Sequence, residues 1–217
     1  MQLWANWLEA LQFALQFFSS TFGVSAGVAI VLLTLTLRLA LLPVSWSAAY
    51  LGCVHRKKLE KLQPELQRLR ERFGREPAVL ARKTARLYRD RNLALVEWRT
   101  FFGSLAQMPV FIGMFQLLRA GANAGKFLWA SSLARPDLLL AIIAGITTAL
   151  MIAANPDLPE QARVILMVLP SVVAILFAMN CASALALYWI TSNIFTAAQT
   201  ATVHFVVGRR IRSGAIG

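Results

Sequence analysis

The sequence predicts an all-α membrane protein with five transmembrane helices, a cytoplasmic helical hairpin and an amphipathic N-terminal helix. Of its 217 residues, 58% are hydrophobic and only 15% are charged, which excludes a disordered chain and fits a polytopic membrane protein. Five apolar stretches approach the length needed to cross a bilayer core of roughly 30 Å. The net charge of +12 is concentrated in one polar stretch and in the C-terminal tail.

Residues 1–20 are predicted to form an amphipathic helix. Apolar side chains recur at helical spacing, and two tryptophans favour the headgroup level of a membrane. This pattern predicts a helix lying on the bilayer surface, with an ordinary helix facing a protein core as the alternative. The apolar positions are Trp4, Trp7, Leu8, Leu11, Leu15 and Phe18.

The first transmembrane segment, over 21–44 with its apolar part at 22–42, contains Arg38 and ends or kinks at Pro43. An arginine cannot lose its proton to relieve burial, and its insertion at mid-helix costs roughly 2.5–3.5 kcal/mol. It could snorkel to the cytoplasmic headgroups. However, the chain stays uncharged after Pro43 as far as Val54. No Asp or Glu lies within any predicted span, so we expect a water-filled recess around Arg38.

Residues 45–100 are predicted to form a basic cytoplasmic helical hairpin broken at Gly74 and Pro77. Between 46 and 103 there are fourteen Lys/Arg and six Asp/Glu, a net charge of +8. This charge either forms a solvated face that fixes topology or binds acidic partners, lipid headgroups or ribosomal RNA. An apolar heptad seam in the first helix consists of Leu59, Leu62, Leu66, Leu69 and Phe73.

Four further transmembrane helices are predicted within 101–207, followed by a basic cytoplasmic tail at 208–217. Their approximate bounds are 101–118, 138–154, 164–181 and 184–207. Because cytoplasmic loops carry more Lys and Arg, the hairpin and tail are predicted to be cytoplasmic and the N-terminus external.

Polar side chains from several spans are candidates for the lining of the recess. Thr34 lies one turn before Arg38 on the same helix face. The other candidates are Gln107, Gln116, Thr191 and Asn193. For each of these except Arg38, the alternative is an ordinary hydrogen bond between helices.

No metal, cofactor or catalytic site is expected. Neither His55 nor His204 belongs to a cluster of potential ligands, and Cys53 and Cys181 are not expected to form a disulfide. No nucleotide motif or nucleophile triad is apparent, so we expect a protein without bond-making chemistry. The N-terminus lacks the basic region of a cleavable signal peptide.

Four blocks of sequence together resemble the YidC-type membrane protein insertases of the Oxa/Alb/YidC superfamily. Their order and spacing agree with that family from about residue 8 to 207, although residues 92–102 depart from the family's usual approach to the second span. The blocks are 35–43 (LTLRLALLP), 61–74 (KLQPELQRLRERFG), 107–111 (QMPVF) and 185–193 (LALYWITSN).

This resemblance implies five helices enclosing a hydrophilic groove that opens to the cytoplasm and to lipid. The groove arginine falls on Arg38, a polar groove residue on Thr34, and a substrate-facing aromatic residue on Trp189 or its neighbour Tyr188. The resemblance also implies an energy-independent insertase in the bacterial inner membrane that functions as a monomer. Its implied partners are nascent membrane proteins, the lipid bilayer, the ribosome, the signal recognition particle pathway and the Sec translocon.

Two other classes of protein remain open from the sequence. One is a small anion transporter or channel that uses Arg38, which would require an opening to the outside. The other is an assembly factor that holds partner helices through Gln and Asn contacts without inserting them.

Overall fold

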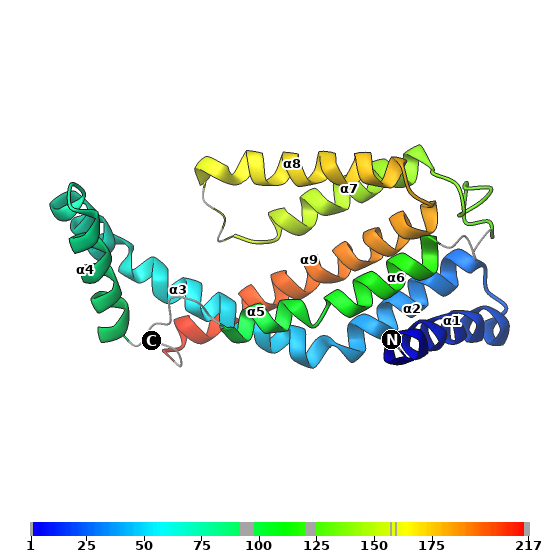
Figure 1. The fold of residues 1–217 in the computed structure, drawn as a ribbon, viewed down its shortest axis with the longest axis horizontal. Coiled ribbons are helices and arrows are strands. Elements are labelled where there is room, and N and C mark those ends of the chain that lie inside the picture. Colours follow the sequence, from blue (N-terminus) through cyan, green and yellow to red (C-terminus); the bar gives the residue numbers. More distant parts are fainter. Residues whose placement is uncertain (1, 92–97, 120–124, 157, 159, 215–217) are drawn as a thin grey trace. The chain divides into compact units, whose positions relative to one another are not determined.

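The computed structural model describes residues 2–91, 98–119, 125–156, 158 and 160–214. Across these residues the chain is helical, apart from one isolated β-bridge between Phe127 and Ala130. It divides into two units, the first made of 1–43 and 106–202 and the second of 44–105 and 203–217. The helices, labelled in Figure 1, are α1 (Gln2–Phe22), α2 (Ala26–Ala40), α3 (Leu42–Phe73), α4 (Pro77–Asp90), α5 (Trp98–Leu105), α6 (Met108–Arg119), α7 (Leu138–Ala153), α8 (Glu160–Met179) and α9 (Ser183–Arg212).

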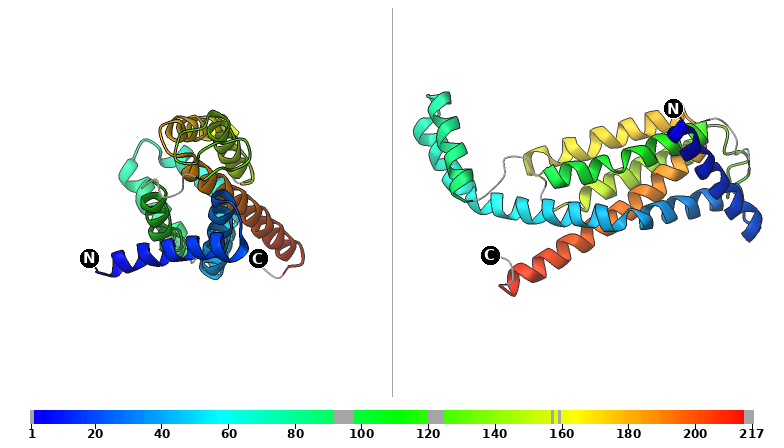
Figure 2. Two further views of the ribbon diagram at one scale, coloured as in Figure 1. Left: turned by 90° about the vertical axis from the view of Figure 1, so that its right-hand side faces the viewer. Right: turned by 60° about the horizontal axis from the view of Figure 1, so that its bottom comes forward.

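The first unit contains α1, α2, α6, α7, α8 and the first two thirds of α9. Helices α7 and α8 lie side by side along their length (Figure 1). Helix α1 packs on α2 and α6 and runs across α2 (Figure 2). The apolar core draws residues from all of these helices, including Leu11, Ile30, Met114, Ala144 and Leu185.

Close helix packing in this unit depends on glycine. A Cβ atom on Gly113 of α6 would lie 2.6 Å from the Trp7 indole of α1, and one on Gly145 of α7 would lie 2.4 Å from Ile175 of α8. Small residues allow such close approach between helices in membranes, where packing replaces the hydrophobic effect as the driving force.

Two helices of the first unit begin at side-chain caps. Ser25 caps α2 by accepting a hydrogen bond from the Val28 N–H, and Asp137 caps α7 by accepting one from the Leu140 N–H at 2.8 Å. Asp137 also accepts a bond from the Trp129 indole, at 3.3 Å. One carboxylate therefore fixes the start of α7 and the loop before it.

Replacing Asp137 with alanine should lower the free energy of unfolding by about 0.5–2 kcal/mol, because the first turn of α7 loses its cap. Asp137→Asn retains a capping oxygen, so its free energy of unfolding should fall much less. Thermal unfolding in detergent checks this, and equal losses for both variants would contradict the capping role.

The second unit contains α3 from Val44, α4, α5 and the end of α9. Helices α3 and α4 are connected by a short turn at Gly74–Glu76, with Pro77 starting α4. Glu65 and Arg91 form an ion pair at 2.7 Å between the two helices. Around Cys53, the start of α3 packs on Val203 and Val207 at the end of α9.

By length and apolar composition, one described helix could cross a membrane, the segment Ala162–Met179 of α8. Counting the broken pair α2 and α3 as one span would add a second. Helices α6 and α7 are apolar but shorter, and α9 is diluted by polar residues such as Asn193 and Gln199. The five predicted transmembrane helices are therefore not established by these criteria.

The second predicted span, 101–118, is not one continuous helix. It is interrupted by a turn at Ala106 and Gln107, which separates α5 from α6. Pro109 lacks an N–H and cannot donate to the preceding turn, which accounts for the break just before it. The atypical approach to this span falls largely on 92–97, outside the described residues.

The outer surfaces of α7 and α8 expose many large apolar side chains. A contiguous apolar surface of this kind is typical of a face that contacts lipid or another protein. Its most exposed members are Leu138, Ile146 and Leu150 on α7 and Val164, Ile165, Val168, Leu169, Val173 and Leu176 on α8.

Candidate functional site

Arg38 lies in the last turn of α2, and its side chain is half-buried within the first unit. Its Nη2 donates a hydrogen bond to the hydroxyl of Ser192 on α9. Among the described residues, no Asp or Glu forms an ion pair with Arg38. The guanidinium is thus held by a neutral partner, and its positive charge is not cancelled by a carboxylate in this part of the chain.

Tyr188 lies one turn before Ser192 on α9 and is buried. It lies on the same face of α9 as Ser192, whose hydroxyl accepts the hydrogen bond from Arg38. Its ring centroid is 6.4 Å from that of Phe111 on α6. Tyr188 therefore connects the arginine to an aromatic cluster.

Trp189 is half-buried in this aromatic cluster. Its ring lies 6.3 Å from Phe111 in an edge-to-face arrangement and 5.5 Å from Phe177 on α8. Phe115 stacks on Phe177 at 6.2 Å and extends the cluster along α6. Aromatic pairs at these separations stabilise a packed arrangement beyond the area they bury. The cluster joins α6, α8 and α9.

Asn193 is next to Ser192 in sequence but faces a different helix. Its Nδ2 donates to Oγ1 of Thr148 on α7 at 2.9 Å, and both side chains are buried. This is the hydrogen bond between helices that the sequence left as an alternative. Asn193 therefore bonds to α7, while its neighbour Ser192 bonds to Arg38.

The remaining four candidates make other contacts. The Thr191 hydroxyl donates to the Leu187 carbonyl at 2.9 Å, and the Gln116 side-chain oxygen accepts from the Trp4 indole at 3.0 Å. Thr34 is on the same helix as Arg38 but is 1% exposed, and its hydroxyl donates to the Ile30 carbonyl at 2.7 Å. Gln107 lies in the turn before α6, where its carbonyl accepts from the Phe111 N–H. The groove therefore remains a prediction. Of the predicted residues, Tyr188 lies one turn from the Ser192 that Arg38 binds, and Trp189 follows it in sequence.

Sequence reasoning missed the partner of Arg38. Ser192 does not stand out in the sequence, because a serine in a helix usually bonds to its own backbone. Thr148 was missed for the same reason, and it also donates to the Ala144 carbonyl. The signal for Ser192 was its spacing of four residues from Tyr188, which places both on one face of α9.

Removing the Asn193–Thr148 contact should have a modest effect. Hydrogen bonds between membrane helices contribute about 0.6 kcal/mol on average and at most about 1.7 kcal/mol. A double-mutant cycle with Asn193→Ala and Thr148→Val, read by unfolding in detergent, should give a coupling energy in this range. A coupling energy near zero would contradict a direct contact.

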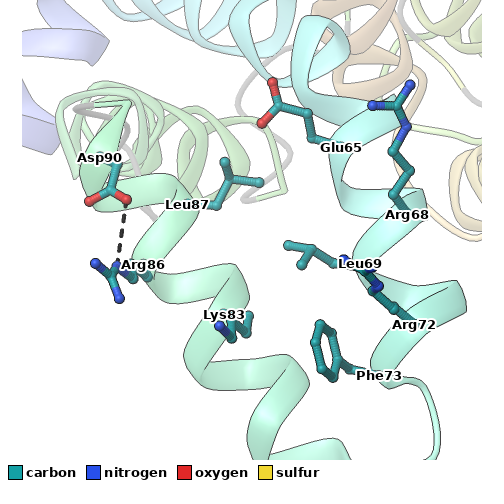
Figure 3. Close-up of a pocket in the computed structure, with 9 residues that line it drawn as sticks. All are labelled: Glu65, Arg68, Leu69, Arg72, Phe73, Lys83, Arg86, Leu87 and Asp90. Atoms are coloured by element: carbon teal, nitrogen blue, oxygen red, sulfur yellow. Dashed lines mark ion pairs between the residues drawn. The ribbon is translucent and has the colours of Figure 1, made fainter.

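A second candidate surface lies between α3 and α4 within the second unit. It is a pocket of about 300 Å³, and in Figure 3 the side chains of Leu69, Phe73 and Leu87 lie between the two helices. Its rim carries Arg68, Arg72, Lys83 and Arg86, with Glu65 and Asp90 also contributing. Arg86 pairs with Asp90 at 3.8 Å, and Lys83 lies 5.9 Å from the centre of the Phe73 ring. This pocket is apolar inside and predominantly basic at its rim.

The described residues do not gather three or more His, Cys, Asp or Glu side chains that could hold a metal ion. Cys53 and Cys181 are not joined in a disulfide. The Cys53 sulfur lies 3.3 Å from Nδ1 of His204 within the second unit.

The fold and the Arg38 site define a helical protein with lipid-compatible surfaces and a charged group held inside one unit. A sequence model of the family described as 60Kd inner membrane protein matches residues 17–209. The chain belongs to this family, the YidC-type membrane protein insertases.

The relatives carry consistent names. The chain is 33% identical to membrane protein insertase YidC 1 of Halalkalibacterium halodurans, covering 93% of this chain and 77% of the relative. It is 31% identical to membrane protein insertase MisCA of Bacillus subtilis, with 82% and 70% covered. It is 34% identical to membrane protein insertase YidC of Cellvibrio japonicus over 96% of this chain but only 37% of that protein.

Proposed function

We propose that this protein is a membrane protein insertase that receives nascent hydrophobic segments beside Arg38 and releases them into lipid. The family membership supports the class of activity, and one observation supports the site: Arg38 is held by Ser192 without a carboxylate partner among the described residues. A positive charge of this kind remains available to an acidic ligand.

In this proposal, five helices enclose a hydrophilic groove open to the cytoplasm and to the bilayer. Helices α2, α6, α7, α8 and α9 supply these spans, with local thinning of the bilayer accommodating the shorter ones. Water in the groove solvates the polar part of a substrate at membrane depth, which lowers the barrier to its passage.

Arg38 attracts acidic residues on the polar part of the substrate, since Coulomb attraction strengthens where water is scarce. The hydrophobic part then moves into lipid, and burial of its roughly 20 apolar residues supplies the free energy. No bond-making chemistry and no energy-supplying cofactor is part of this mechanism. Trp189 and Tyr188 are proposed to contact the substrate, and Thr34, Gln107 and Asn193 to contribute to the polar character of the groove.

We further propose that the protein lies in a bacterial cell membrane with its N-terminus outside and its C-terminus in the cytoplasm. The α3–α4 hairpin is then cytoplasmic, and its basic rim faces the source of substrates. Nascent membrane proteins and the bilayer are the essential partners, and the ribosome, the signal recognition particle pathway and the Sec translocon are candidate donors. A monomer suffices for this mechanism.

Reconstitution in liposomes tests the proposal. An insertase should drive protease-protected insertion of a small single-span substrate, and the liposomes should retain their ion gradients without substrate. Ion flux through protein-only liposomes would instead indicate a channel. Binding of the substrate without protection from protease would indicate an assembly factor that does not insert.

A further inference from the structure

A second pocket lies between α1 and α2 in the first unit. It has a volume of about 400 Å³, within the roughly 300–1,000 Å³ of typical ligand pockets. The pocket exists because two small residues, Ala10 and Ala14, lie one turn apart on α1 beside larger neighbours. Leu33 and Leu37 of α2 form its opposite wall.

The lining of this pocket presents no unused hydrogen-bonding group among its described residues. The Thr36 hydroxyl donates to the Leu32 carbonyl at 2.9 Å, and the Trp7 indole N–H donates to the Pro109 carbonyl at 3.2 Å. The other lining side chains are apolar. The pocket offers a ligand no hydrogen bonds, so any polar group on the ligand would lose its hydration without compensation.

The rim of the pocket exposes aromatic rings. Phe13 is 71% exposed and Phe17 is 48% exposed. Phe17, Phe18 and Phe22 also lie close together at the end of α1, with ring centroids 6.0–6.4 Å apart. Such rings in an amphipathic helix favour the boundary between headgroups and acyl chains, where they escape water. The pocket would then open toward the hydrocarbon.

We propose that this α1–α2 pocket binds the acyl chain of a membrane phospholipid and so stabilises α1 against α2. The proposal rests on the membrane location within the proposed function, but not on insertion activity. An acyl chain needs no hydrogen bonds, whereas an extended peptide would leave its backbone groups unsatisfied. A whole helix, about 10–12 Å across with its side chains, is too wide for the space.

Photolabelling of the full chain in vesicles tests the proposal. The vesicles consist of palmitoyl-oleoyl phosphatidylcholine with a fraction of the same lipid carrying a diazirine in its acyl chain. Labelling of peptides with residues 10–18 and 33–37 should exceed that of the exposed face of α8, which contacts bulk lipid.

Ala14→Phe fills the pocket and should lower the binding constant, and with it the labelling of a sparsely occupied site, about tenfold, which corresponds to a loss of about 1.4 kcal/mol. Ala10→Phe fills the pocket from its more exposed side and replaces Ala14→Phe in the test if that variant does not fold. Ala5→Phe adds the same ring to α1 outside the pocket lining and should leave labelling unchanged. The proposal would be overturned if the peptides with residues 10–18 and 33–37 were labelled no more than α8. It would also be overturned if Ala14→Phe or Ala10→Phe folded but left that labelling unchanged.

A photoreactive benzoylphenylalanine in place of Phe13 identifies the occupant by the mass of its adduct. We expect a phospholipid adduct; an adduct with a second copy of the chain would overturn the proposal. Neither measurement requires substrate, so a protein that lacks insertion activity can still bind the lipid, and the two proposals fail separately.

Discussion

Arg38→Ala should reduce insertion of substrates whose translocated segment carries an acidic residue by about thirtyfold. At a separation of about 8 Å and an effective dielectric constant of about 20, the attraction between two unit charges is about 2 kcal/mol. That energy corresponds to about thirtyfold in an equilibrium constant. A substrate with a neutral translocated segment should be inserted nearly as well as before. Protease protection in liposomes measures both rates.

Two variants separate charge from other effects of this substitution. Arg38→Lys keeps the charge and should retain much of the activity if attraction at a distance is what matters, but little if the planar guanidinium must form two parallel bonds. Arg163→Ala removes an exposed arginine from the start of α8 and serves as the matched control. Equal losses on acidic and neutral substrates would remove the electrostatic role of Arg38.

Gly145→Ala should destabilise the protein by about 1–3 kcal/mol, the usual cost of forcing extra volume into a packed core. The added methyl group would lie 2.4 Å from Ile175 and 3.1 Å from the Ser171 carbonyl, so either the Ile175 side chain must leave its rotamer or α7 and α8 must move apart. Gly208→Ala in α9 is the matched control, because its Cβ meets nothing within 4 Å. There alanine should stabilise the helix by up to about 1 kcal/mol.

The two substitutions are expected to change the free energy of unfolding in opposite directions, so their difference is easy to detect. Unfolding of both variants in the same detergent measures the difference in free energy directly. A Gly145→Ala variant as stable as Gly208→Ala would show that α7 and α8 do not pack at the described distance.

Some features of the fold follow from local sequence and others do not. Gly74 and Pro77 end one helix and begin the next for reasons confined to a few residues, so the break between α3 and α4 could be predicted. Pro109 likewise indicates the break between α5 and α6. However, the residues on both sides of it are apolar, and this pattern predicts one continuous span. Hydrophobic periodicity alone does not decide between these readings.

The sequence identifies the polar residues of the site but not which of them bond to one another. Arg38 stands out in the sequence because it is charged within an apolar run. That Ser192 faces α2 while Asn193 faces α7 depends on the rotation of α9, which is set by packing against several helices at once. The aromatic cluster of Phe111, Phe177 and Trp189 likewise joins helices far apart in sequence.

Contact between a nascent chain and the surroundings of Arg38 is the point on which the whole account depends. We would place benzoylphenylalanine at position 189, where Trp189 is half-buried in the aromatic cluster, and crosslink it to a ribosome-stalled membrane-protein segment. A matched probe replaces Ile146, which is 53% exposed on α7. Strong crosslinking is expected from position 189, and Arg38→Ala should lower it for an acidic substrate. Crosslinking only from position 146 would contradict this expectation.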